Sequence, residues 1–300
     1  MADNDLVHNR SPLAAGVVEQ VSPLLRRLVA PNPSPFTFTG TCSYIVGQGR
    51  VAIVDPGPEN EEQLAALLKA VEGESVSHIV VTHTHRDHSP GARALRAATG
   101  APIFGCARHV PIKDDASGRL DASHDLDHMP DQEMRDGDVL RGDGFTLEAI
   151  HTPGHASNHL CFGLAQENAL LSGDHVMAWS TSIVAPPDGV MSDYMASLEK
   201  LRGRDDRIYW PGHGGPVTEP QRYLRALLHH RRQREISILN RLSEGESEIG
   251  PLVEKIYEGL DPRLKPAAAL SMLAHLEDLT ARGIVAADGP ATLNARYRKV

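Results

Sequence analysis

The chain has 300 residues, of which 41% are hydrophobic and 4% aromatic, and its formal net charge is −9. This length favours one large domain, alone or with a smaller appendage. No apolar run approaches the length of a bilayer span, the N-terminus lacks the features of a secretory signal, and Cys42, Cys106 and Cys161 form no disulfide framework. We therefore expect a cytoplasmic protein without a membrane partner.

Charge and histidine are unevenly distributed along the chain. Residues 221–300 carry 13 basic against 10 acidic side chains, whereas residues 1–220 carry 17 against 29. An acidic body repels polyphosphate unless metal ions reverse the local field. The 16 histidines are many for 300 residues, and several of them cluster, so scattered surface positions do not explain them all.

Residues 41–220 alternate β-rich and helical segments. In chain order, the pattern predicts a hairpin over 41–55, a helix over 59–72, a strand over 78–81, a helix from Ser89 to about 98, strands at 102–104, 145–150, 159–162 and 169–171, a helix over 193–202 and a strand at 208–210. Metal-binding side chains follow several of these strands directly. Open α/β sheets generally place ligands at such strand ends.

The chain after residue 220 has a helical pattern. Leucine and isoleucine recur at three- and four-residue intervals, which predicts helices over 222–242, 249–256 and 270–279. A small hairpin is predicted from residues 284–286 and 291–293, which flank a polar turn. Three helices followed by a hairpin are typical of a winged helix.

The first metal-binding segment follows a short buried strand. His83, His85, Asp87 and His88 lie within six residues of one another. In extended backbone the side chains of residues i and i+2 share a face, so His83 and His85 can hold one ion while Asp87 and His88 face a neighbouring ion.

Four ligands cannot fill two coordination spheres. The missing donors are expected at later strand ends, where His155, Asp174 and His213 each stand beside glycine. Asp174 is a lone carboxylate between histidine groups, which suits a bridge between two ions. Taken singly, these three residues would be ordinary core or surface positions, and only the preceding cluster makes them candidates.

With these residues, the chain resembles the metallo-β-lactamase fold superfamily. The matching segments are TCSYIV (41–46), VDPG (54–57), THTHRDH (82–88), HTPGH (151–155), SGD (172–174) and PGHG (211–214). The resemblance implies an α+β fold, a four-layer αββα sandwich over residues 1–220 with its metal site at one edge. Residues 221–300 resemble the small, helical, winged-helix-like C-terminal domain of the β-lactamase-like-protein-2 group.

The resemblance also implies the cofactors and their ligands. Two divalent metal ions are expected, usually zinc and sometimes manganese or iron. The implied ligands are His83, His85 and His155 for one ion, Asp87, His88 and His213 for the other, and Asp174 as the bridge. Asp55 resembles an aspartate that orients a ligand histidine, and its alternative role is that of a turn residue.

The expected activity is hydrolysis by a metal-bridging hydroxide, which Asp87 orients and whose proton it accepts. We favour a small thioester substrate, as in hydroxyacylglutathione hydrolases. One alternative is a single-strand RNA endoribonuclease, and another is a winged-helix binding protein with a vestigial metal site, against which the complete ligand set argues. No cysteine stands at a ligand position, which disfavours a β-lactam substrate. A homodimer formed through the C-terminal domain is also considered.

Three further features have a structural interpretation beside the functional one. The segment His124-Asp125-Leu126-Asp127-His128 resembles a metal cluster by composition, but no buried strand precedes it, so a solvated loop is expected, with the rim of the cleft as the alternative position. The basic residues Arg225, Arg231, Arg232 and Arg234 are expected on a solvated helix face. His159 is either a residue that supports the metal site or an ordinary strand histidine.

Overall fold

A computed structural model describes residues 6–110, 124–245 and 247–300. Its helices are α1 (Glu61–Ala70), α2 (Gly91–Thr99), α3 (Met191–Arg202), α4 (Pro220–Ser243), α5 (Ile249–Ile256) and α6 (Lys265–Ala281). Its strands are β1 (Val18–Gln20), β2 (Leu25–Val29), β3 (Cys42–Val46), β4 (Arg50–Val54), β5 (Ser75–Val81), β6 (Ile103–Gly105), β7 (Gln132–Glu133), β8 (Val139–Arg141), β9 (Thr146–His151), β10 (Leu160–Leu164), β11 (Ala169–Gly173), β12 (Ile208–Pro211), β13 (Ser247–Glu248), β14 (Val285–Ala287) and β15 (Arg296–Lys299).

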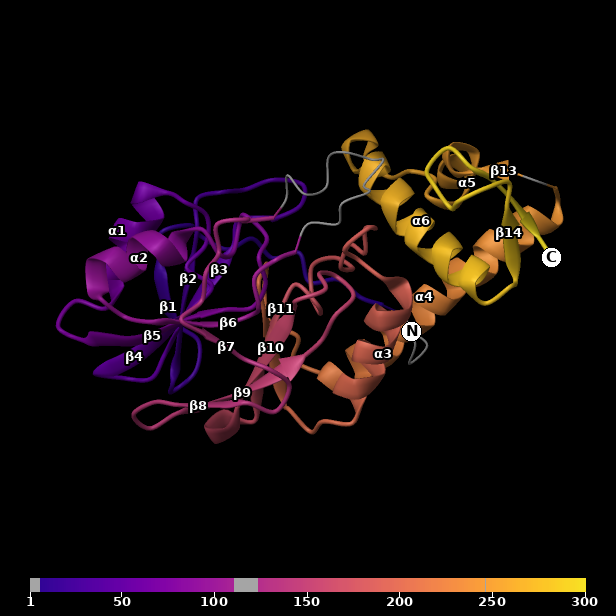
Figure 1. The fold of residues 1–300 in the computed structure, drawn as a ribbon. Coiled ribbons are helices and arrows are strands. Elements are labelled where there is room, and N and C mark those ends of the chain that lie inside the picture. Colours follow the sequence, from indigo (N-terminus) through magenta and orange to yellow (C-terminus); the bar gives the residue numbers. More distant parts are fainter. Residues whose placement is uncertain (1–5, 111–123, 246) are drawn as a thin grey trace.

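The strands form two large sheets that pack face to face. One has the order β1-β2-β3-β4-β5-β6-β7 and the other the order β12-β11-β10-β9-β8. Helices α1 and α2 lie outside the first sheet, and α3 and α4 lie outside the second (Figure 1). This arrangement confirms the four-layer αββα sandwich predicted from the sequence.

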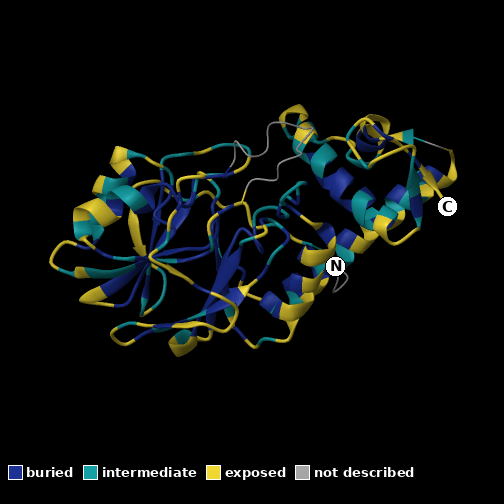
Figure 2. Ribbon diagram, viewed as in Figure 1, coloured by how far each residue is buried: buried dark blue, intermediate teal, exposed yellow. Residues whose placement is uncertain are grey.

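Two hydrophobic clusters hold these layers together. The larger lies between the sheets, where it includes Tyr44 and Phe162, and continues under α1 and α2, where it includes Ile53 and Ile79. The second lies under α3 and α4 and includes Tyr194 and Leu224. The buried strands of both sheets are dark blue in Figure 2, whereas the outer faces of the helices are exposed. This pattern is expected when helices cover sheets on both sides.

The C-terminal part confirms the predicted helices and a small sheet, with one correction. Helices α5 and α6 pack with the strands β13-β15-β14 around a third hydrophobic cluster. The second strand of the hairpin is β15, not residues 291–293 as the sequence predicted. Only Tyr297 of β15 is buried, and its basic neighbours hide the strand from a hydrophobic pattern.

Helix α4 belongs to two hydrophobic clusters. Its first half places Leu224 and Leu227 in the cluster under α3, and its second half places Ile238 and Leu242 in the C-terminal cluster. The domain boundary after residue 220 stays a prediction, because α4 packs against the sandwich as well as against the C-terminal part. No helix in the described part of the chain is both long and apolar enough to cross a bilayer.

Candidate metal centre

The candidate metal centre lies where several strands of both sheets end. His83, His85, Asp87 and His88 follow β5 directly, whereas Asp174 follows β11. Strands β11 and β12 run parallel, so their ends meet at one edge and bring Asp174 near His213. His155 lies in the loop between β9 and β10. The structure thus brings together all seven predicted ligands, from segments spread over 130 residues.

The first group consists of His83, His85 and His155. Nδ1 of His85 lies 3.0 Å from Nε2 of His83 and 3.0 Å from Nε2 of His155. Nδ1 of His155 lies 2.6 Å from the carbonyl oxygen of Ile183, which can only accept, so this nitrogen carries the proton. Nε2 of His155 therefore points a lone pair at His85.

His83 is held in the same tautomer. Its Nδ1 lies 2.9 Å from Oγ1 of Thr82, and that hydroxyl donates its own proton to Asp55. The hydroxyl must therefore accept from Nδ1 of His83, which leaves Nε2 as a lone pair. Two imidazole lone pairs converge on the third ring, and a divalent cation is the group that such donors fit.

The second group consists of Asp87, His88, Asp174 and His213. Nε2 of His88 lies 3.3 Å from Nε2 of His213, and Oδ2 of Asp87 lies 3.1 Å from the same atom of His213. Nδ1 of His88 is 2.9 Å from Oδ2 of Asp55, and Nδ1 of His213 is 3.2 Å from the carbonyl oxygen of Gly40. In the neutral rings both Nε2 lone pairs face the carboxylates, so this donor set also fits a cation.

Asp174 lies between the two groups. Its Oδ2 is 3.7 Å from Nε2 of His155 and 3.3 Å from Nε2 of His213, while its Oδ1 is 3.4 Å from Nε2 of His88. This Oδ1 is buried and accepts no hydrogen bond from the described residues. A buried acceptor without a donor is costly, and a cation shared between the groups would satisfy it.

Asp55 supports both the strand end and the second group. Its carboxylate accepts hydrogen bonds from the backbone and hydroxyl of Thr82, at 2.8 and 2.7 Å, as well as contacting His88. Its backbone adopts φ +48°, which is unusual for a residue other than glycine. Of the two roles considered for Asp55, orientation of His88 is the one that these contacts support.

His159 and two glycines shape the space around Asp174. Nε2 of His159 accepts a hydrogen bond of 3.2 Å from the backbone of Asp174, and its Nδ1 lies 2.9 Å from Oγ1 of Thr152. A Cβ atom at Gly173 would approach Nε2 of His159 to 2.5 Å, and one at Gly212 would approach Oδ1 of Asp174 to 2.5 Å. Glycine is therefore required at both positions.

The two groups differ in their electrostatics. Burial and the neighbouring His88 lower the pKa of His83 well below its usual value, so its ring is neutral. Burial acts in the same direction on His213, but Asp174 and Asp87 outweigh it and raise its pKa to about 9. A metal ion that binds the second group must therefore displace protons.

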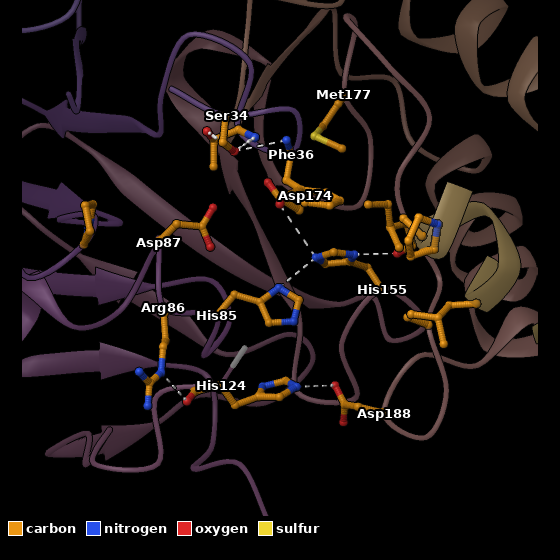
Figure 3. Close-up of a pocket in the computed structure, with 17 residues that line it drawn as sticks. Ser34, Phe36, His85, Arg86, Asp87, His124, His155, Asp174, Met177 and Asp188 are labelled. Carbon is orange, nitrogen blue, oxygen red and sulfur yellow. Dashed lines mark hydrogen bonds and ion pairs between the residues drawn. The ribbon is translucent and has the colours of Figure 1, made fainter. Parts of the chain in front are cut away.

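A pocket of about 560 Å³ opens beside these side chains. Figure 3 shows His85, Asp87, His155 and Asp174 among the side chains that line it. Among the lining residues that the structure describes, the one Lys or Arg is Arg86, whose Nε donates to the carbonyl oxygen of His124. Apart from Pro58, the apolar lining comes from three segments, 34–37, 177–185 and 266–270.

The segment 124–128 was predicted wrongly as a solvated loop. His124, Asp125 and His128 are buried. Asp125 accepts hydrogen bonds from Arg93 and from Ser89. The prediction failed because the burial of this loop depends on contacts with distant residues.

His109, His124 and Asp188 also lie together, and the last two line the pocket. The rings of His109 and His124 are stacked, with centroids 3.7 Å apart and planes inclined by 6°. An imidazole binds a metal in its own ring plane, and two parallel planes cannot share one ion. We therefore do not assign a third metal site to this group.

Arg231 is a further residue that the sequence misplaced. The predicted solvated arginine is 4% exposed on α4, where its guanidinium donates to the carbonyl oxygen of Ser182 and lies 5.0 Å from the ring centre of Tyr194. The next carbonyl, of Ile183, holds His155. Arg231 of α4 thus contacts Ser182, and the next residue in the chain contacts the candidate ligand His155. This connection is seen only in the folded structure.

Comparison with known proteins matches both parts of the chain. The model of the "Metallo-beta-lactamase superfamily" matches residues 36–213, and that of the "Beta-lactamase associated winged helix domain" matches residues 249–291. An atrochrysone carboxyl ACP thioesterase of Cryptosporiopsis sp. is 33% identical over 236 residues, which cover 77% of this chain and 66% of that relative. A beta-lactamase-like protein 2 homolog of Caenorhabditis elegans is 29% identical, with 89% of this chain and 88% of that protein covered.

Solved structures give the same result. A metallo-beta-lactamase family protein from Thermus thermophilus has a TM-score of 0.76 and 26% identity, and the match covers 94% of this chain and all of that one. A beta-lactamase domain protein from Burkholderia ambifaria, at 20% identity, shares the fold with a TM-score of 0.81, and the match covers 97% of this chain and 95% of that one.

The chain therefore belongs to the metallo-β-lactamase superfamily. It is a hydrolase of that superfamily with a C-terminal winged-helix domain, as the resemblance in its sequence implied. The superfamily typically uses divalent metals, and the donor groups described above are the candidates to hold them.

Proposed function

We propose that this protein hydrolyses thioesters with the help of two divalent metal ions, for which zinc suits the imidazole and carboxylate donors. His83, His85 and His155 would hold one ion. Asp87, His88 and His213 would hold the other, with Asp174 between them. When bound, the ions would acidify a water molecule and polarise the substrate's carbonyl oxygen.

The observation that carries the thioester proposal is the lining of the pocket beside these donors. Phe36, Met177, Ile183 and Leu270 supply large apolar groups. Such a lining suits an apolar acyl group, whereas an RNA backbone would require cations along its path. The relatives named as ACP thioesterases support the same substrate class.

Asp87 has the position to act on the attacking water. It lines the pocket, and its side chain is 27% exposed. Burial alone would raise the pKa of Asp87, but His88 and His213 lower it, so the group is an ionised carboxylate. It can accept a hydrogen bond from the water, while the oxygen attacks the carbonyl carbon, the carbon–sulfur bond breaks and the thiolate takes up the proton.

An activity screen tests this proposal. The full chain, reconstituted with zinc or manganese, is assayed against acyl thioesters, lactones, lactams, phosphodiesters and single-stranded RNA. We expect two metals per chain and thioester cleavage faster than any other reaction. Cleavage of RNA with no thioester turnover would instead support the endoribonuclease alternative, and failure to bind metal would refute both.

A further inference from the structure

We propose that the first turns of α6 bind the acyl part of the substrate and select for bulky apolar acyl groups. This inference rests on the proposed thioesterase function. The winged-helix domain would then supply part of the substrate site, although the candidate metal ligands lie elsewhere in the chain.

The start of α6 lies on the pocket. Pro266, Ala267 and Leu270 line it together with His85 and Asp174. Residues 266 and 270 are one helical turn apart and so share a face of the helix. In Figure 3, a helix passes along the side of the pocket near His155. These side chains can therefore contact a substrate whose carbonyl group lies at the candidate metal centre.

The apolar residues Phe36, Ile183 and Leu270 of the pocket are not explained by core packing. Phe36, Met177, Ile183 and Leu270 belong to none of the three hydrophobic clusters of the described residues. Phe36 is 49% exposed, although an aromatic ring gains considerably from burial. Large apolar side chains that face a concave site mark a ligand surface.

The acyl group is the part of a thioester that fits this wall. The reacting carbonyl must lie beside Asp87, and the acyl chain and the thiol arm extend from it in different directions. The thiol arm of a carrier is rich in amides and would leave its polar groups unpaired against Leu270 and Phe36. An alkyl or aryl acyl group carries no such cost.

Two substitutions at the wall test the proposal. Zinc-reconstituted full chains are assayed with N-acetylcysteamine thioesters of acetate, hexanoate, decanoate and benzoate, so that only the acyl part changes. We expect Ala267→Phe, which fills the pocket, to lower kcat/KM for decanoate by about tenfold or more and to change acetate far less. Leu270→Ala removes an apolar contact and should lower the decanoate value as well.

The matched control is Ala281→Phe, the same change at the exposed last residue of α6, about 21 Å along the helix from Ala267. It should leave kcat/KM unchanged for all four thioesters. Thermal melting checks that each variant folds, and Ala267→Leu replaces Ala267→Phe if the larger side chain prevents folding. An unchanged decanoate-to-acetate ratio in folded wall variants would overturn the proposal.

A binding experiment separates this inference from the proposed function. If the wild-type protein cleaves no thioester, the thioesterase proposal fails, and calorimetric binding of decanoate and acetate to the zinc-loaded chain then decides about the wall. Weaker decanoate binding by Ala267→Phe than by Ala281→Phe would support an apolar ligand site at α6. Equal binding by the two variants would refute it.

Discussion

The tautomers of individual histidines are fixed by partners outside the candidate metal centre. Thr82 fixes His83, Ile183 fixes His155, and Asp55 contacts His88. In the neutral form of each ring, the other nitrogen keeps a lone pair directed inward. Such outer partners commonly change metal affinity 10- to 100-fold when they are removed.

The bridging position of Asp174 leads to a test by metal binding. Asp174→Ala should weaken the binding of both ions and abolish turnover, because the two carboxylate oxygens of Asp174 lie near ligands of both groups. His213→Ala should weaken mainly one ion. Titration calorimetry with zinc measures the number of ions bound by each variant and their affinities. His151→Ala, at an exposed histidine outside the groups, is the control and should bind two ions. If Asp174→Ala binds two ions with unchanged affinity, Asp174 is not a bridge.

Much of the candidate site could be predicted from the sequence because its ligands follow strands directly. His83, His85, Asp87 and His88 lie within one six-residue segment, and a strand end fixes where the side chains of such a segment lie. The role of Asp55 stayed open, because only the folded chain brings it to His88. The apolar pocket was not predicted, since its residues come from three separate segments.

At the scale of elements, the segment that connects Asp174 to α3 links helix α4 to the candidate metal centre. Arg231 of α4 holds the carbonyl of Ser182, Oγ of Ser182 donates to the carbonyl of His175, and the carbonyl of Ile183 holds His155. The segment is therefore fixed from both sides, and its position depends on a buried side chain of α4.

Loss of that contact should disturb metal binding. Arg231→Met should loosen the loop around Ile183 and weaken the ion held by His155 by roughly tenfold, the lower end of the range for outer partners. Competition with a chromophoric chelator measures this affinity. Arg232→Met is the control, because Arg232 is exposed and pairs only with Glu199 among the described residues. Equal affinities in the two variants would show that Arg231 serves packing alone.

Two strands that the sequence failed to predict, β2 and β15, share a physical feature. Strand β2 contains Arg26 and Arg27, yet Arg27 is buried and pairs with Glu19 of β1. Strand β15 is basic apart from Tyr297. A hydrophobic pattern identifies strands whose side chains are apolar, so strands whose charges are paired or solvated escape it. The strands of the inner core were predicted within a few residues.

At the scale of the whole molecule, the two parts of the chain share α4. A chain that ends at Glu219 loses Tyr223, Leu224, Leu227 and Leu228 from the cluster under α3. Burial of such side chains stabilises a protein by about 1.5–3 kcal/mol each, so their sum is comparable to the roughly 5–15 kcal/mol that stabilises a typical domain. We expect this truncation to unfold the catalytic part, although it removes no candidate ligand.

A longer chain is the matched comparison. A chain that ends at Gly245 keeps α4 and should fold with a lower melting temperature, because Ile238 and Leu242 lose their partners. Gel filtration and near-ultraviolet circular dichroism distinguish the two outcomes. A compact, cooperatively melting chain that ends at Glu219 would show that α4 is dispensable for the catalytic part.

The shared helix has a consequence for biosynthesis. The last candidate ligand, His213, is translated before α4, so a nascent chain holds every metal donor while α3 is the one described helix available to cover the outer face of its second sheet. Until Leu224 and Leu228 emerge from the ribosome, Tyr209 and Leu170 lack part of the cluster that buries them. Exposed strands of this kind aggregate readily during folding. The yield of active protein in a cell should therefore depend on chaperone supply during this interval, and early metal loading would not shorten it.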